Sequence, residues 1–353
     1  MPDRATMHAM YLAKPASAES NPLRPAEVPT PAPGPGELLV RVDFCGVCRT
    51  DLHIVEGELP PLRERVIPGH EVVGHVAALG RDATGVAVGD LVGIPWLHST
   101  CGECEFCRSG RENLCERKSF TGYSVDGGYA EYAVARDRFV LPLSADDAAR
   151  RAPFLCAGII GYRALKLVMP PAGGRIGFFG FGGSAHLTLP VAARLGYETV
   201  AYSRNPEHLR LAARLGASET VLLGGKSTET PNVSRPARLD AAVVFSPSGE
   251  TVLEALRELK KGAALAIAAI HLSPIPPIDY DRWLFGERRI LSVEANTRAD
   301  AREFLDLADR LRLDSTIQLR PLAQANEALA DLKAGRVTGA VVLDCRAGGS
   351  EAA

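Results

Sequence analysis

The sequence lacks several features that would place it in a special class of protein. It has no apolar run near the roughly 18 residues that a membrane-spanning helix needs, and no apolar segment follows the charges of its opening MPDRATMHAM. It also has no large excess of either charge, because its formal net charge is only -2. Nothing therefore predicts binding to nucleic acid or to a membrane, and we expect a cytoplasmic protein.

What the sequence does contain is typical of a two-domain globular protein. Its 353 residues exceed the size of one ordinary domain, and its composition is 46% hydrophobic and 23% charged. Eight cysteines are present. Because reducing compartments keep thiols free, clustered cysteines in such a protein are expected to bind metal more often than to pair with each other.

The pattern of apolar residues changes partway along the chain. Up to about residue 150, short apolar runs such as VVGHVAALG and GGYAEYAVA are broken by glycine and proline, which predicts a β-rich domain. Beyond Cys156, strand-like runs alternate with helix-like ones, which predicts a parallel sheet with helices on both faces. We interpret the late strand VTGAVVLD as a return to the first domain.

The segment CGECEFCRSGRENLC contains four of the cysteines: Cys101, Cys104, Cys107 and Cys115. This spacing lets one loop surround a tetrahedral ion with four thiolates, the closed set that structural zinc favours. An iron–sulfur cluster is an alternative, although the Cys-Pro ending of a ferredoxin motif is missing. Unligated thiols are a second alternative. We expect a structural zinc site in residues 96–118, the cysteine lobe.

Three further segments contain residues suited to a second metal ion: CGVCRTDLH (Cys45 to His53), PGHE (Pro68 to Glu71) and LCAG (Leu155 to Gly158). A catalytic zinc needs three protein ligands and one open position, which two cysteines and one histidine from separate loops would supply. Each residue alone also has an ordinary explanation, since a lone cysteine is often just a small buried hydrophobe.

The run RIGFFGFGGSAH places Gly180-x-Gly182-x-x-Ala185 between an expected strand and an expected helix, the context of a dinucleotide-binding turn. Gly180 permits the tight turn, while Gly182 and the adjacent Gly183 let the backbone approach a pyrophosphate. Pro190 falls inside the expected helix, which predicts a kink or an early turn there.

In their order along nearly the whole chain, these motifs resemble those of the zinc-dependent medium-chain alcohol dehydrogenases. The resemblance implies an α/β protein in which a GroES-like β-barrel catalytic domain is combined with a doubly wound, parallel-sheet Rossmann domain. The catalytic domain is expected at residues 1–156 and 297–353, and the Rossmann domain at residues 157–296. The active site is expected in the cleft between them.

The resemblance also implies a catalytic zinc site. The residues that match its metal centre are Cys48, His70, Cys156 and Glu71. The first three match the ligands, with an open fourth position, and the glutamate matches an acidic residue behind the metal. Asp51 matches a carboxylate that orients the ligand histidine, whereas Cys45 is expected as a neighbouring buried thiol. Together with the cysteine lobe, this implies two zinc ions per chain.

The implied reaction is reversible hydride transfer between a primary alcohol or its aldehyde and NAD(P), in oxidoreductase class EC 1.1.1. Hydride leaves an alcohol readily only after its oxygen is deprotonated, which a zinc ion promotes as a Lewis acid. Thr50 matches the hydroxyl that bonds the alcohol oxygen, and His53 matches the outer end of the proton path. A solvated surface histidine is the alternative for His53.

The preferred nicotinamide cofactor is expected to depend on the segment ETVAYSRNPEH. An NAD site has an acidic residue here for the ribose 2′-hydroxyl, whereas this sequence has Ser203 followed by Arg204. A hydroxyl and a guanidinium suit a 2′-phosphate. We therefore favour NADP(H), with NAD(H) as the alternative. By resemblance, Arg49 contacts the cofactor pyrophosphate.

Two residues match the substrate pocket of the family. Trp96 matches a pocket-lining aromatic residue, with a core tryptophan as the alternative. Leu59 is aromatic in the relatives with the narrowest pockets, so we expect a wider pocket that admits longer or aromatic alcohols and aldehydes. A homodimer or homotetramer is expected. A zinc-independent quinone or enoyl reductase of the same fold, or a non-catalytic relative, is the alternative, and the intact Cys, His, Cys set argues against both.

Overall fold

The computed structural model describes residues 5–144, 147–224 and 238–346, which fold as two compact units. The first unit comprises Met1–Cys156, Ala295–Glu303 and Ser315–Ala353, and the second comprises Ala157–Glu294 and Phe304–Asp314. The segment Phe304–Asp314 thus differs from the sequence prediction, which placed it in the first domain. The reason is packing: the fully buried Phe304 ring lies where a side chain at Gly158 would have to be.

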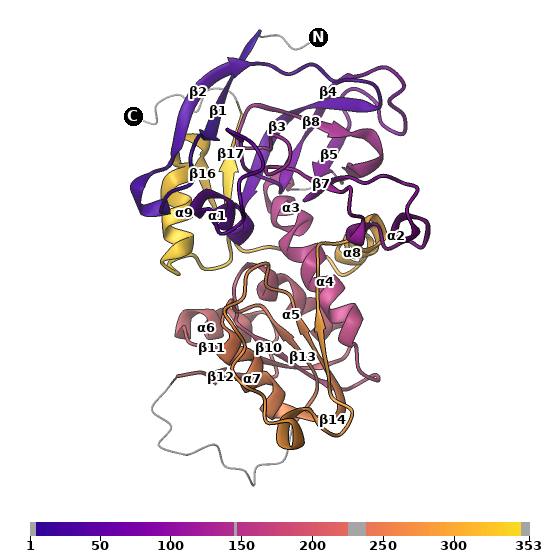
Figure 1. The fold of residues 1–353 in the computed structure, drawn as a ribbon, viewed down its shortest axis with the longest axis vertical. Coiled ribbons are helices and arrows are strands. Elements are labelled where there is room, and N and C mark those ends of the chain that lie inside the picture. The colour runs from indigo at the N-terminus through magenta and orange to yellow at the C-terminus, as the bar shows by residue number, and fades with distance from the viewer. Residues whose placement is uncertain (1–4, 145–146, 225–237, 347–353) are drawn as a thin grey trace. The chain divides into compact units, whose positions relative to one another are not determined.

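The first unit is built on an extended β-sheet. Its strands are β3 (Glu37–Val47), β4 (Val72–Leu79), β5 (Leu91–Ile94), β8 (Tyr132–Arg136), β9 (Leu141–Pro142), β16 (Ile317–Pro321) and β17 (Ala340–Asp344). The sheet order is β16-β17-β3-β4-β5-β9, and β8 pairs with β3. Since β17 pairs antiparallel with β3, the C-terminal strand joins the sheet of the N-terminal half, as the sequence indicated (Figure 1).

Smaller elements surround this sheet. The strand pairs are β1 (Thr6–Leu12) with β2 (Leu23–Pro29), and β6 (Leu97–Ser99) with β7 (Ser119–Phe120). The helices are α1 (Arg49–Glu56), α2 (Glu105–Arg108), α3 (Ala148–Arg151) and α9 (Ala325–Lys333), with 3₁₀ turns η1 (Ala18–Ser20), η2 (Glu112–Leu114), η3 (Asp137–Phe139), η4 (Ala152–Leu155) and η6 (Leu322–Gln324). Helices α1 and α9 lie side by side and cover part of the core (Figure 1).

The second unit is a parallel sheet between helices. Its strands are β10 (Arg175–Phe179), β11 (Glu198–Ser203), β12 (Glu219–Leu222), β13 (Leu239–Val244), β14 (Leu259–Ile267) and β15 (Arg289–Ser292). They run in the order β12-β11-β10-β13-β14-β15, and every pairing is parallel. The order reverses beside the first strand, as in a doubly wound dinucleotide-binding fold. The predicted Rossmann-type sheet is therefore confirmed.

Helices alternate with these strands as the sequence predicted. They are α4 (Ala157–Val168), α5 (Gly183–Arg194), α6 (Pro206–Arg214) and α7 (Gly249–Glu258), with the π-helical turn η5 (Tyr280–Leu284) near β15, and α8 (Arg298–Arg310) contributes to both units. Helix α5 continues through Pro190, which removes one backbone donor without ending the helix. No helix in the described parts of the chain has the length and apolar character needed to cross a membrane.

Candidate active site

Four side chains from three separate segments converge in the first unit: Cys48, His70, Glu71 and Cys156, the mixed metal group. One potential ligand atom from each lies within 4.8 Å of the others. The Sγ atoms of Cys48 and Cys156 are 3.8 Å apart. Two thiolates bound tetrahedrally at about 2.3 Å from one zinc ion would be roughly 3.8 Å apart, so this pair fits a shared ion.

His70 has the hydrogen bonding of a metal ligand. Its side chain is fully buried, and its Nδ1 donates to Oδ1 of Asp51 over 2.9 Å. Its Nε2 has no hydrogen-bond partner within the described residues. A buried polar atom left unsatisfied costs about 1–3 kcal/mol, so this nitrogen needs a partner that the protein itself does not provide. A metal ion beside the two thiols would satisfy it.

Asp51 ties the ligand-bearing segments together. It is the third residue of α1, and its Oδ2 accepts from the backbone N–H of Cys48 over 2.9 Å, which forms a capping box. Its Oδ1 accepts from the backbone of Gly69 at 3.1 Å as well as from His70. The Tyr129 hydroxyl donates to Oδ2 at 3.3 Å. One buried carboxylate thus positions two of the segments that bear potential ligands.

Two glycines make the close packing around this group achievable. Gly69 has φ 99°, and a Cβ there would lie 2.5 Å from the Tyr129 ring. A Cβ on Gly46 would lie 1.9 Å from Oε2 of Glu71. Any larger residue at either position would therefore displace the ring behind Asp51 or the carboxylate of Glu71.

The charges of the two thiols are coupled. The hydrogen bond from Cys156 holds the pKa of Cys48 well below its ordinary value, although burial opposes this, and His70 adds to the lowering. The same bond, together with burial, raises the pKa of Cys156. Burial also raises the pKa of the neighbouring Cys45, which is not part of the mixed metal group. One proton shared between two thiols is the state that a bound cation would replace with two thiolates.

The predicted catalytic residues Thr50 and His53 lie on α1. The Thr50 hydroxyl is buried and lies 3.8 Å from Sγ of Cys48. His53 is only 5% exposed, and its Nδ1 pairs with the carboxylate of Glu58. A freely solvated surface histidine is therefore the wrong description of His53. The Glu58 side chain is 40% exposed and reaches solvent. Sequence reasoning missed Glu58, for which nearness to His53 was the only signal.

The two predicted pocket residues differ in their surroundings. The ring of Trp96 packs edge-on against His70 with centroids 4.9 Å apart and stacks on Phe120 at 4.6 Å. Trp96 is also part of the hydrophobic core of the first unit. Leu59 is half-buried and packs against the same core. Only Trp96 has a described contact with a member of the mixed metal group.

The cysteine lobe forms a second group of potential ligands. One sulfur from each of Cys101, Cys104, Cys107 and Cys115 lies within 4.8 Å of the others. Cys101 lies 3.8 Å from Cys107 and 3.5 Å from Cys115, and Cys104 lies 3.5 Å from Cys107. Backbone amides of the loop hold the pKa of Cys101 at about 6. Through residues 100–118, all of them described, no leucine or phenylalanine is buried, so no apolar core holds this loop.

In the glycine-rich turn of the second unit, one glycine is required by the fold and two others leave space for a ligand. Gly180 has φ 86°, and a Cβ there would lie 2.9 Å from the backbone nitrogen of Ser246, so the fold itself requires glycine. A Cβ on Gly182 or Gly183 would meet nothing within 4 Å. The protein leaves this space open at the start of α5, where backbone N–H groups attract anions. The turn therefore fits a dinucleotide pyrophosphate.

The residues predicted to select the cofactor lie at the end of β11. Ser203 is buried, and its Oγ accepts from the backbone of Asn205 at 3.1 Å. Arg204 is exposed. In the first unit, Arg49 is also exposed, and its guanidinium donates to the Leu332 carbonyl over 3.3 Å.

Comparisons with known proteins match a family model to part of the first unit and a full-length relative to nearly the whole chain. The family model "Alcohol dehydrogenase GroES-like domain" matches residues 34–145, which confirms the predicted GroES-like fold. The "probable alcohol dehydrogenase AdhA" of Mycobacterium tuberculosis is 48% identical over 347 residues, covering 96% of this chain and 97% of the relative.

Solved structures agree over almost the entire chain. A cinnamyl alcohol dehydrogenase from Sorghum bicolor superposes with a TM-score of 0.87 at 26% identity and covers 99% of this chain and 100% of its own. An acetophenone reductase from Geotrichum candidum in complex with NAD has a TM-score of 0.85 at 26% identity, with 98% of each chain covered.

Proposed function

This chain belongs to the zinc-type medium-chain alcohol dehydrogenase family, and from that premise we propose that Cys48, His70 and Cys156 hold a catalytic zinc ion. The observation that carries the proposal is the pair of sulfurs 3.8 Å apart beside a buried histidine nitrogen without a partner. Sulfur and nitrogen donors in this number are the set that catalytic zinc uses. Glu71 supplies a further carboxylate oxygen within 4.8 Å of these donors.

A zinc ion in this site supplies Lewis acidity that activates an alcohol or aldehyde oxygen. Asp51 fixes the tautomer of His70 by accepting from Nδ1, which leaves Nε2 to bind. Thr50 offers a hydroxyl that both accepts and donates, as transfer of the alcohol proton requires. His53 and Glu58 then extend the path from the buried hydroxyl to an exposed carboxylate.

We propose that the second unit binds the nicotinamide dinucleotide, which accepts or donates the hydride. Gly182 and Gly183 leave room for its pyrophosphate, and Arg49 is a candidate for a further contact with it. Ser203 and the exposed Arg204 favour the 2′-phosphate of NADP(H). NAD(H) is the alternative, and the acetophenone reductase noted above is described in complex with NAD.

We propose a structural zinc ion in the cysteine lobe, which gives two zinc ions per chain. The expected substrates are primary alcohols and aldehydes, including longer or aromatic ones that reach Trp96 and Leu59. The likeness to a cinnamyl alcohol dehydrogenase supports this breadth. We also propose a homodimer or homotetramer. A cytoplasmic location is proposed because reducing compartments keep cysteine thiols free to bind metal.

The test is metal analysis combined with turnover of alcohols and aldehydes by the wild type and Cys48→Ser. The wild type should contain two zinc ions and the variant one, while turnover falls about a thousandfold or more because the Lewis acid is lost. Cys45→Ala is the matched control, since it removes a neighbouring buried thiol outside the mixed metal group. Full activity in Cys48→Ser would contradict the proposed site.

Cofactor choice has its own test in Arg204→Ala. Loss of a charge-assisted contact to the 2′-phosphate should raise the KM for NADPH roughly tenfold and leave the KM for NADH nearly unchanged. Arg214→Ala removes another exposed arginine of the second unit and is the control. Equal changes with both cofactors would defeat the NADP(H) assignment.

A further inference from the structure

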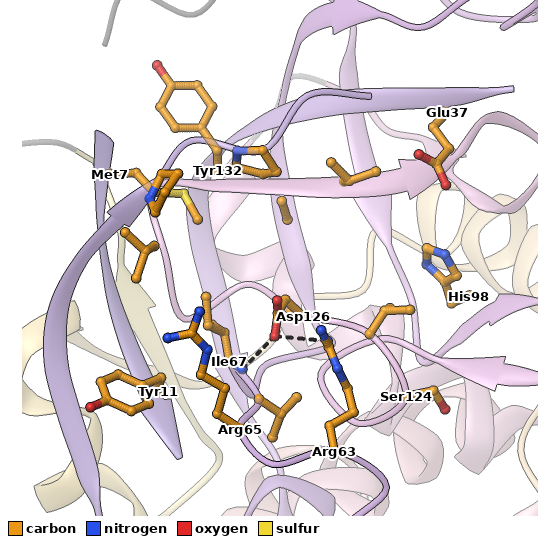
Figure 2. Close-up of a pocket in the computed structure, with 18 residues that line it drawn as sticks. Met7, Tyr11, Glu37, Arg63, Arg65, Ile67, His98, Ser124, Asp126 and Tyr132 are labelled. Carbon is orange, nitrogen blue, oxygen red and sulfur yellow. Dashed lines mark hydrogen bonds and ion pairs between the residues drawn. The ribbon is translucent and has the colours of Figure 1, made fainter. Parts of the chain in front are cut away.

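A cavity of about 500 Å³ lies in the first unit, away from the mixed metal group (Figure 2). Its wall is formed by the β1–β2 hairpin, by residues 63–67 and 124–127, and by β8; we call it the hairpin cavity. Met7, Val28, Ile67 and Val134 supply apolar surface to it. None of the lining residues belongs to the mixed metal group or to the four cysteines of the lobe. Its volume is in the range of pockets that hold small organic molecules.

His98 gives the hairpin cavity a buried polar group without a partner. The residue is 6% exposed, and its Nδ1 makes no hydrogen bond to any described residue. Burial lowers the pKa of His98 to about 4, so the imidazole is neutral at neutral pH. It can therefore bond a hydroxyl or a carbonyl, but it does not attract an anion. His98 lines the cavity, and its unsatisfied Nδ1 is available to bond a polar atom of a ligand.

The acidic groups of the cavity are already neutralised. Asp126 pairs with Arg63 over 3.2 Å and also accepts from the backbone of Ile67 at 3.0 Å. Glu37 pairs with Arg136 over 3.5 Å and accepts from the backbone of Gly34.

Arg65 is different, because its guanidinium has no ion pair or hydrogen bond within the described part of the chain. It extends along the side of the cavity opposite to His98 (Figure 2). The uncompensated charge is therefore positive and lies on the opposite side of the cavity from a neutral hydrogen-bonding group. An elongated ligand with an anionic end and a polar far end complements this arrangement.

We propose that the hairpin cavity binds a small carboxylate with an apolar body, whose anionic end pairs with Arg65 and whose opposite polar atom bonds to Nδ1 of His98. A guanidinium suits a carboxylate because it offers paired donors in the geometry of the two oxygens. This proposal depends only on the hairpin cavity and its lining residues, and it is independent of the function of the mixed metal group.

Calorimetric titration of the full-length zinc-loaded protein tests this site. The probe is 3-(4-hydroxyphenyl)propanoate, with 3-phenylpropanoate and the uncharged 3-(4-hydroxyphenyl)propanamide as comparisons. Arg65→Ala should weaken binding of both carboxylates about tenfold. His98→Phe should weaken binding of the hydroxylated probe several-fold and leave 3-phenylpropanoate unchanged. Arg81→Ala, an exposed arginine outside the cavity, should change nothing.

Cys48→Ser separates this site from the mixed metal group, because binding in the hairpin cavity should persist in that variant. Absence of binding to the wild type, equal affinity for the amide, or loss of binding in Cys48→Ser would each overturn the proposal. Light scattering tests whether this face is instead a contact between copies of the chain. A change of assembly mass in Arg65→Ala, with the affinity for the carboxylates unchanged, would assign this face to a contact between copies of the chain and overturn the ligand site.

Discussion

The cysteine lobe and the mixed metal group both gather four potential ligands within 4.8 Å, yet they are built in opposite ways. The lobe takes all its donors from fifteen consecutive residues, and the amides of its own loop lower the pKa of Cys101. The mixed metal group joins Cys48 to Cys156 across 108 positions of sequence and rests on the buried carboxylate of Asp51. One group organises a loop, whereas the other depends on the folded unit around it.

The difference also lies in what each set of donors can do. Four thiolates close the shell of a tetrahedral ion and leave no place for a substrate. Two sulfurs and one imidazole leave a position open, and Glu71 has a carboxylate oxygen within 4.8 Å of these donors. A closed coordination shell is suited to a structural metal site. An open shell supported by a buried hydrogen-bond network is suited to catalysis. Substitutions in the cysteine lobe should therefore mainly change the stability of the fold. Substitutions in the mixed metal group should mainly change turnover.

Cys104→Ser should have the largest effect on stability. Because no leucine or phenylalanine of residues 100–118 is buried, loss of the ion should cost several kcal/mol in the free energy of unfolding. Thermal unfolding monitored by circular dichroism, with zinc analysis, measures this change. Ser109→Ala, an exposed change in the same loop, is the control. Unchanged unfolding with both zinc ions retained would remove the structural role.

Asp51→Asn should have an intermediate effect that is confined to the mixed metal group. Loss of the charged acceptor behind His70 should lower zinc affinity or turnover 10- to 100-fold, roughly the range for such supporting partners. Chelator competition and steady-state kinetics measure the two quantities. Asp43→Asn is matched, because Asp43 pairs with His75 over 2.6 Å at a site without cysteine ligands. Equal losses in both variants would indicate a general folding defect.

The smallest effect is a pH dependence of thiol alkylation in the zinc-stripped protein. The pKa of Cys48 lies below its ordinary value, and the pKa values of Cys156 and Cys45 lie above theirs. A lowered pKa leaves more thiolate at a given pH, so Cys48 should react at lower pH than the other two. Peptide mass spectrometry after timed iodoacetamide treatment measures the order. Protection by added zinc is the control, and equal pH profiles would contradict the coupling.

Much of the fold could be predicted because its signals are local. The strands RIGFF and ETVAYS and the helices that follow them occur where strand-like runs alternate with helix-like ones in the sequence. Within the helix-like run TVLEALRELKKG, α7 ends at Glu258, because buried Leu259 begins β14 and pairs with Leu239. The predicted family, fold class and alcohol dehydrogenase activity are confirmed.

By itself, the sequence determined the loop of four closely spaced cysteines, the glycine-rich turn, and the change from β-rich to alternating structure. These are short-range features, since each depends on residues that stay neighbours whatever the rest of the chain does. Only the tertiary structure decided that Tyr129 bonds to Asp51, that Glu58 pairs with His53, and that Arg65 and His98 line the same cavity. Such contacts join segments far apart or depend on side-chain direction, and packing of the folded units fixes them.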